Sequence, residues 1–201
     1  MIYDYYGFPK ESYDIQYPVS GDPVLANRIV NLLKRSNIEA RSDDQRGFDH
    51  GVFVPLKIMY PNAEIPCVQL SLVRNMRPDQ HIIIGKALTD IIEENVLVIG
   101  SGFSFHNLRA FFEPPTKESE LLNQSFEQWL IETCFSKEFS ESEREKKLIN
   151  WEAAPGARYC HPREEHLLPL HVCYGIARSP ARQVFRLKIM ERHSSAYLWQ
   201  N

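Results

Sequence analysis

The feature that most constrains the fold is an apolar run at residues 96–99, Val-Leu-Val-Ile, which ends in Gly100, Ser101 and Gly102. A short run that is apolar at every position predicts a strand buried on both faces, as in parallel sheets covered by helices. Helical patterns lie on both sides of it, and alternating strands and helices predict an α/β protein. We therefore expect one domain, residues 1–201, with a central mixed, largely parallel sheet flanked by helices.

The helical patterns begin with Asp22 and Pro23, an N-cap residue followed by a proline at the first helical position. Leu25, Ile29 and Leu32 then share one helix face. Residues 3–18 predict an irregular arm, because aromatic residues, prolines and glycine follow one another without a period. Further helices are expected at residues 52–59, from Pro78, within residues 118–151, and from Pro162 to Ala177; further strands are expected at residues 38–41, 66–71 and 183–190.

Composition excludes several classes of protein. The formal net charge is −3, so no strong positive field favours nucleic acid or an anionic membrane as the main partner. No apolar run approaches the roughly 20 residues of a membrane span, and the N-terminus lacks the pattern of a signal peptide. The four cysteines form no Cys-x-x-Cys pair, which argues against a disulfide scaffold or a zinc ribbon. We expect a soluble, cytoplasmic protein.

His106 is the histidine whose position best suits chemistry. It follows the end of the predicted strand by a few residues, and ligands of open α/β sheets bind outside the carboxyl ends of the strands. Position alone leaves open a histidine that simply bonds to a loop carbonyl group.

The other histidines are more ambiguous. His50 follows Asp49 in a glycine-flanked loop, where a helix-capping role is the simpler interpretation. His161 and His166 are five residues apart, about 140° from a common helix face, so they cannot pair as in a His-Glu-x-x-His motif. One of them could face a site while the other caps the helix. His81, His171 and His193 have no supporting neighbours and are read as structural or surface residues.

Motifs for other chemistries are absent. The sequence contains no Gly-x-Ser-x-Gly elbow, no P-loop and no Gly-x-Gly-x-x-Gly fingerprint. Several strings nevertheless occur together in a distinctive order. They are residues 3–9 (Tyr-Asp-Tyr-Tyr-Gly-Phe-Pro), 17–23, 47–51 (Gly-Phe-Asp-His-Gly), 59–71, 100–108 (Gly-Ser-Gly ending in His-Asn-Leu) and 161–170 (His-Pro-Arg-Glu-Glu-His-Leu-Leu-Pro-Leu).

Together these strings resemble the class III extradiol ring-cleavage dioxygenases, specifically the 4,5-DOPA dioxygenase-like branch. The resemblance implies an oxidoreductase that opens a catechol such as L-DOPA with O₂ at a non-haem metal, Fe(II) or Zn(II). It implies that His106 is the catalytic acid/base, that His166 is a metal ligand and that His50 lies in the substrate pocket. Such chemistry needs a metal ion held on one face by three groups and a base of near-neutral pKa.

The chain departs from this pattern at its start. The two histidine motifs that supply the other metal ligands are absent, and we expect the chain to lack that N-terminal segment. An alternative is a catalytically inactive member of the family that binds a small aromatic molecule or a protein. A zinc hydrolase shares the α/β plan, but the ligand set for it is incomplete.

Overall fold

The structure is a computed structural model that describes residues 1–200. These residues form two compact units, Met1–Ser71 and the part of the chain from Leu72 onward. The fold is of the mixed α/β class, as the sequence predicted.

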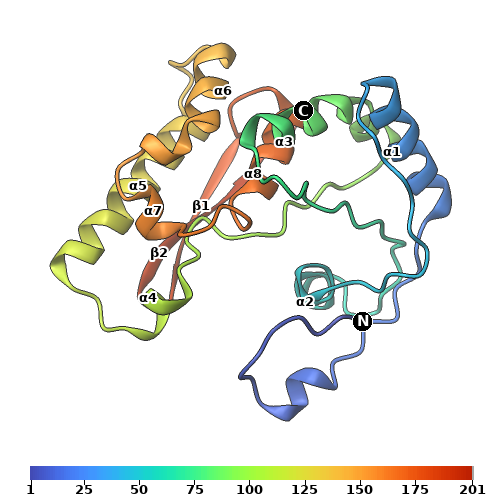
Figure 1. Cartoon of the computed structure of the whole chain (residues 1–201), viewed down its shortest axis with the longest axis horizontal. Coiled ribbons are helices and arrows are strands. Elements are labelled where there is room, and N and C mark those ends of the chain that lie inside the picture. Colours follow the sequence, from blue (N-terminus) through green and yellow to red (C-terminus); the bar gives the residue numbers. More distant parts are fainter. Residues whose placement is uncertain (201) are drawn as a thin grey trace. The chain divides into compact units, whose positions relative to one another are not determined.

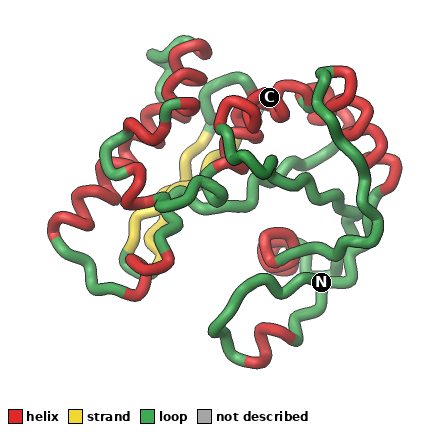
Figure 2. Tube along the Cα trace, viewed as in Figure 1, coloured by secondary structure: helices red, strands yellow, loops and turns green. Residues whose placement is uncertain are grey.

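The first unit is built from short elements joined by long loops (Figure 2). It contains η1 (Lys10–Tyr13), α1 (Pro23–Arg35) and α2 (His50–Met59). The predicted start of α1 is confirmed, because the Leu25 amide donates to the Asp22 carboxylate at 2.9 Å and Pro23 opens the helix. Ile29, Leu32 and Leu33 form its buried stripe.

The predicted irregular arm packs through its aromatic rings. The Tyr3 hydroxyl donates to the Ile15 carbonyl at 2.7 Å, which closes the arm on itself. The Tyr3 ring meets Phe53 of α2 edge to face, with 5.6 Å between ring centroids. Aromatic contacts therefore fix an arm that has only one turn of 3₁₀ helix.

The second unit holds the main core. Its elements are α3 (Pro78–Ala87), η2 (Thr89–Glu94), α4 (Leu108–Phe112), α5 (Lys117–Phe135), α6 (Glu141–Ile149), η3 (Trp151–Ala153), α7 (Ala157–Cys160), α8 (Leu168–Ala177), β1 (Gln183–Ile189) and β2 (Arg192–Leu198). Figure 1 shows α3 and α8 side by side. Phe105, Phe126, Leu130 and Trp151 are central to a continuous hydrophobic cluster.

Two glycines allow α3 and α8 to approach closely. A Cβ at Gly85 would lie 2.2 Å from the Val172 carbonyl oxygen, and one at Gly175 would lie 2.3 Å from that of Ile82. Only a residue without a side chain fits at this distance, so both glycines are required by helix packing.

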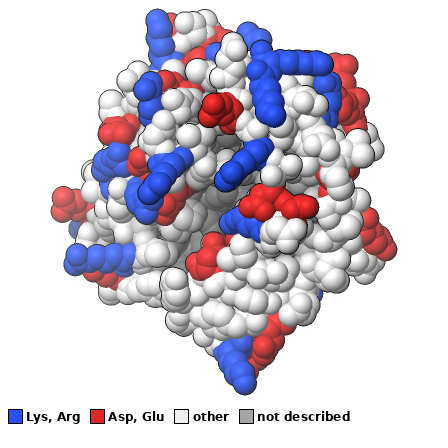
Figure 3. Space-filling view, turned by 45° about the vertical axis from the view of Figure 1, so that its right-hand side comes forward, with Lys and Arg blue, Asp and Glu red and all other residues white. Residues whose placement is uncertain are grey.

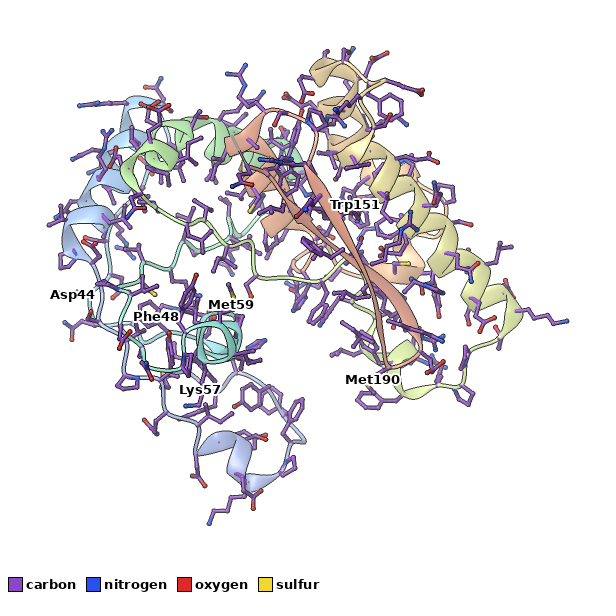
Figure 4. All side chains as sticks on the ribbon, turned by 180° about the vertical axis from the view of Figure 1, so that it is seen from behind. Asp44, Phe48, Lys57, Met59, Trp151 and Met190 are labelled. Carbon is purple, nitrogen blue, oxygen red and sulfur yellow. The ribbon has the colours of Figure 1, made fainter. Side chains whose placement is uncertain are left out.

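The sheet differs from the one predicted. In the described part of the chain it consists of two antiparallel strands, β1 and β2, paired from Gln183 with Leu198 to Ile189 with Arg192. The predicted strand at residues 183–190 is confirmed as β1. The turn, where Figure 4 labels Met190, places Met190 and Glu191 at φ of 47° and 63°. The chain uses neither Asn nor Gly there, so the sequence lacked the usual signal of a hairpin turn.

The expected central, largely parallel sheet is not formed by residues 1–200, and residues 96–102 are not a strand. The Leu97 side chain is 61% exposed. The segment lies instead against α8, where a Cβ at Gly100 would lie 2.7 Å from the Cys173 sulfur. A strand needs a neighbour to pair its backbone groups, and a helix offers none.

Three further expectations are corrected. Residues 38–41 form no strand, and residues 66–71 contribute only an isolated parallel bridge between Gly21 and Cys67. The helix expected from Pro162 begins at Leu168, with Pro169 in its first turn. Residues 161–167 form a turn instead, closed by the Leu167 amide donating to the Glu164 carbonyl at 2.8 Å.

Charged side chains of both signs are interspersed on the face seen in Figure 3. Within residues 1–200, no helix is both long enough and apolar enough to cross a membrane.

Candidate functional site

The candidate site is centred on the His106 loop, which we define as residues 100–107. Ser104 and Phe105 are buried, whereas His106 is half-buried. Asn107 then caps α4, because its side-chain oxygen accepts from the Ala110 amide at 3.1 Å. The loop is therefore held at its C-terminal end, and the His106 side chain is partly open to solvent.

Backbone hydrogen bonds fasten this loop to residues 159–166. The Phe103 amide donates to the His166 carbonyl at 3.0 Å, and the His106 amide donates to the Cys160 carbonyl at 2.9 Å. A Cβ at Gly102 would lie 2.3 Å from the His166 carbonyl oxygen, so this contact requires glycine. Two segments that are distant in sequence are thus held in register.

The result is a pair of stacked imidazoles, His106 and His166, which we call the histidine pair. Their ring centroids are 3.3 Å apart and their planes differ by 13°. The side chain of His166 is 27% exposed, and its Nδ1 lies 3.7 Å from the Glu165 carboxylate. The structure therefore brings together two of the three site residues that the sequence indicated.

The donor set around this pair does not fit a three-ligand metal centre. Imidazoles that share a metal ion direct their in-plane lone pairs at one point about 2.1 Å from each nitrogen. Stacked rings hold those lone pairs in two nearly parallel planes, which do not converge. The described residues also contain no group of three or more His, Cys, Asp or Glu side chains that could hold a metal ion.

His161 holds the His106 loop through a hydrogen bond in the protein interior. It is fully buried, and its Nε2 donates to the Ser104 carbonyl at 2.7 Å. Burial lowers the pKa of His161 to about 4, so the ring is neutral at pH 7 and serves as a structural donor. This histidine follows the last residue of α7.

His50 lies in the first unit, where it has partners of its own. Its Nδ1 is 2.5 Å from the Asp4 carboxylate, and its ring meets Tyr5 edge to face at 5.7 Å. Burial raises the pKa of Asp4, but the hydrogen bonds from His50 outweigh it and the net pKa is lowered. The adjacent Asp49 instead binds Arg46 and Gln69. The partner of His50 is therefore a residue far away in the sequence.

The remaining histidines are outside the candidate site. His81 is buried, with its Nε2 accepting from the Val73 amide at 3.1 Å. His171 is buried against the carbonyl groups of Leu148 and Leu167, and His193 is exposed on β2.

Sequence reasoning missed a buried polar cluster behind the His106 loop, formed by Ser104, Glu127 and Ser195. The Ser195 hydroxyl donates to Glu127 at 2.6 Å, and the Ser195 amide donates to the Ser104 hydroxyl at 2.7 Å. The helical periodicity of the sequence could have indicated that Glu127 is buried, because position 127 falls on the same helix face as the buried Leu130 and Ile131.

Comparison with known proteins identifies the family. Residues 1–197 match the family described as the catalytic LigB subunit of aromatic ring-opening dioxygenase. The chain belongs to this family.

Individual members of this dioxygenase family are similar over most of the chain. A 4,5-DOPA dioxygenase extradiol of Beta vulgaris is 38% identical over 179 residues, covering 88% of this chain and 64% of that protein. The dioxygenase tasH of Hapsidospora irregularis is 35% identical over 190 residues, covering 88% of this chain and 57% of that protein. The chain thus spans less than two thirds of the length of these two dioxygenases.

A solved structure has a similar fold. The crystal structure of an uncharacterised protein from Escherichia coli K12 superimposes with a TM-score of 0.74 at 28% identity. The match covers 91% of this chain and 75% of that one.

Proposed function

We propose that this protein acts in the extradiol cleavage of a catechol such as L-DOPA by O₂. The observation that carries the proposal is the histidine pair. Two motifs far apart in sequence place the His106 and His166 ring centroids 3.3 Å apart, and both residues are half-buried. The family match over residues 1–197 supplies the reaction class.

His106 is proposed as the acid/base group. Deprotonating a catechol near neutral pH needs a side chain that exchanges a proton in that range, and imidazole is the side chain that does so. The backbone bond to Cys160 and the buried Ser104 and Phe105 hold His106 in place, while its half-exposed ring stays accessible to a substrate hydroxyl group.

His50 is proposed to contact the substrate. With Nδ1 facing the Asp4 carboxylate, its Nε2 carries the free lone pair and can accept a hydrogen bond from a catechol hydroxyl. The edge-to-face contact with Tyr5 limits rotation of the ring.

Enzymes of this family are non-haem metal dioxygenases. His166 is proposed as the contribution of this chain to binding Fe(II) or Zn(II), and iron is the ion that supports redox chemistry with O₂. Since the described residues do not form a complete ligand set, we derive no step through the metal.

Oxygen uptake tests the function directly. The chain, purified anaerobically and loaded with Fe(II), is expected to consume O₂ with L-DOPA and to form a ring-opened, coloured product. His106→Ala should slow uptake by about 10²- to 10⁴-fold, because general acid/base catalysis contributes that much. His193→Ala, a change at an exposed histidine, should leave the rate unchanged.

The metal assignment is checked on the same preparations. Loading with Zn(II), which has no redox chemistry, should abolish uptake. His166→Ala should reduce the bound metal measured by elemental analysis. A folded, Fe(II)-loaded chain that consumes no O₂ with L-DOPA would contradict the proposed function.

A further inference from the structure

A buried carboxyl group stands behind the His106 loop. Glu127 of α5 is only 5% exposed, and its Oε2 accepts a hydrogen bond from the Ser195 hydroxyl at 2.6 Å. Its Oε1 is buried and has no hydrogen-bonding partner among the described residues. Burying a carboxyl group costs free energy unless hydrogen bonds or opposite charges offset the loss of hydration.

Glu127 connects three elements through two serines. Ser195 lies on β2, and its amide donates to the Ser104 hydroxyl at 2.7 Å. Ser104 belongs to the His106 loop and precedes His106 by two residues. Its carbonyl group accepts from His161 at 2.7 Å. The position of the His106 loop is therefore determined from one side by Glu127 and from the other by His161.

The surroundings make the charge of Glu127 sensitive to small changes. Burial raises its pKa to about 7, while the nearby Ser104 and Ser195 hydroxyls and the positive charge of Arg186 lower it. The titratable and charged groups that face Glu127 are Arg186 on β1, His193 and Tyr197 on β2, Cys134 on α5 and Cys160 on α7. Burial keeps both thiols protonated by raising their pKa, so Arg186 is the one fixed charge among these neighbours.

The two forms of the carboxyl group offer different hydrogen bonds. An ionised carboxylate accepts a charge-assisted hydrogen bond from the Ser195 hydroxyl. A protonated one can carry its hydrogen atom on Oε1, which has no partner among the described residues, and the bond from Ser195 to Oε2 then becomes a bond between neutral groups. Charge-assisted bonds are stronger than neutral ones, so protonation of Glu127 weakens its bond to Ser195, whose amide in turn holds the Ser104 hydroxyl.

We propose that Glu127 is a positioning residue for His106: its ionised carboxylate holds the His106 loop through Ser195 and Ser104, and its protonation loosens that loop. The catalytic meaning of this rests on the proposed function, since His106 is the acid/base group there. The coupling between the protonation of Glu127 and the position of the His106 loop needs neither metal nor substrate, so it can be tested on the folded chain alone.

Nuclear magnetic resonance of the metal-free protein tests the coupling. Between pH 5.5 and 8.5, the amide signals of Ser104 and Phe105 should follow the titration of the Glu127 side-chain carbonyl, with the same midpoint. Glu127→Gln should abolish that transition. Glu132→Gln, an exposed glutamate on the same helix, should leave it unchanged.

A second variant keeps the test decisive if Glu127→Gln does not fold. Ser104→Ala removes the link to the loop but leaves the Glu127 and Ser195 contact, so the transition should persist at the Ser195 amide and disappear at Phe105. A transition at Phe105 that survives either change, or that follows the His106 ring instead, would overturn the proposal. Absence of oxygen uptake would leave these signals unaffected, so the two proposals fail separately.

Discussion

At the scale of single residues, the partners of the histidines decide what each can do. His106 and His166 stack on each other, His161 is buried as a neutral donor, and His50 faces a carboxylate. Identical side chains thus acquire different chemistry from their contacts, and the three site residues that the sequence indicated, His106, His166 and His50, are each partly accessible to a solute.

The contact between Asp4 and His50 leads to a prediction about the tautomer of the ring. In the wild-type chain, Nδ1 should carry the proton, since it faces the Asp4 carboxylate at 2.5 Å. Asp4→Ala should shift the neutral ring toward the form protonated at Nε2. Nitrogen-15 spectra of the imidazole measure the two forms.

Asp4→Asn should largely restore the wild-type tautomer, because an amide oxygen also accepts a hydrogen bond. Asp14→Asn, a change at an exposed aspartate of the same arm, is the matched control. A ring that stays protonated at Nδ1 in Asp4→Ala would show that Asp4 does not orient it.

At the scale of elements, close backbone contacts hold the second unit together. The crossing of α3 and α8 depends on Gly85 and Gly175, and the His106 loop depends on Gly102 against His166. Buried arginines also donate hydrogen bonds to backbone carbonyl groups that follow the last residues of helices. Arg144 donates to the Ser136 carbonyl after α5, and Arg192 donates to the Glu113 carbonyl after α4.

Gly175→Ala should destabilise the protein by about 1–3 kcal/mol, the usual cost of overpacking. The new Cβ would lie 2.3 Å from the Ile82 carbonyl oxygen, which the backbone of α3 cannot move without strain. Urea unfolding measures the change in the free energy of unfolding. Gly21→Ala, where a Cβ meets nothing within 4 Å, is the control and should change stability little. Equal effects of the two substitutions would argue against the close helix crossing.

At the scale of the whole molecule, buried titratable groups make stability depend on pH. Burial lowers the pKa of His161 and of His171 from 6.5 to about 4, so the unfolded chain binds more protons than the native one between these values. Their contribution to stability is present above pH 6.5 and is lost as the pH falls toward 4. Glu127 acts in the opposite sense between pH 4.5 and about 7, since its pKa is raised in the native state.

The two histidines together outweigh Glu127, so the free energy of unfolding should fall as the pH falls from 6.5 to 4.5. The net loss is roughly 3 kcal/mol, because one pKa unit corresponds to about 1.36 kcal/mol. Urea unfolding at several pH values measures this loss. His161→Gln should make the curve clearly flatter, whereas His193→Gln, at an exposed position, should not. A wild-type free energy of unfolding that does not change over this range would contradict the assignment of buried neutral histidines.

Local patterns were sufficient wherever the decisive interaction is local. Asp22 and Pro23 start α1, Pro78 starts α3, and the alternation of elements indicated an α/β fold, because capping and periodicity depend on neighbours in sequence. The strings around His106 and His166 likewise carried the resemblance to the family that the comparisons confirm.

Only the tertiary structure decided which backbone groups pair and which side chains meet. Residues 96–99 have the composition of a buried strand but lie beside α8, since strand formation depends on a partner that local sequence does not specify. The turn at Met190 and the link from Glu127 through Ser195 to Ser104 arise in the same way. The sequence by itself determined the helix starts and the family, while long-range contacts determined the sheet, the partner of each histidine and the acid that holds the His106 loop.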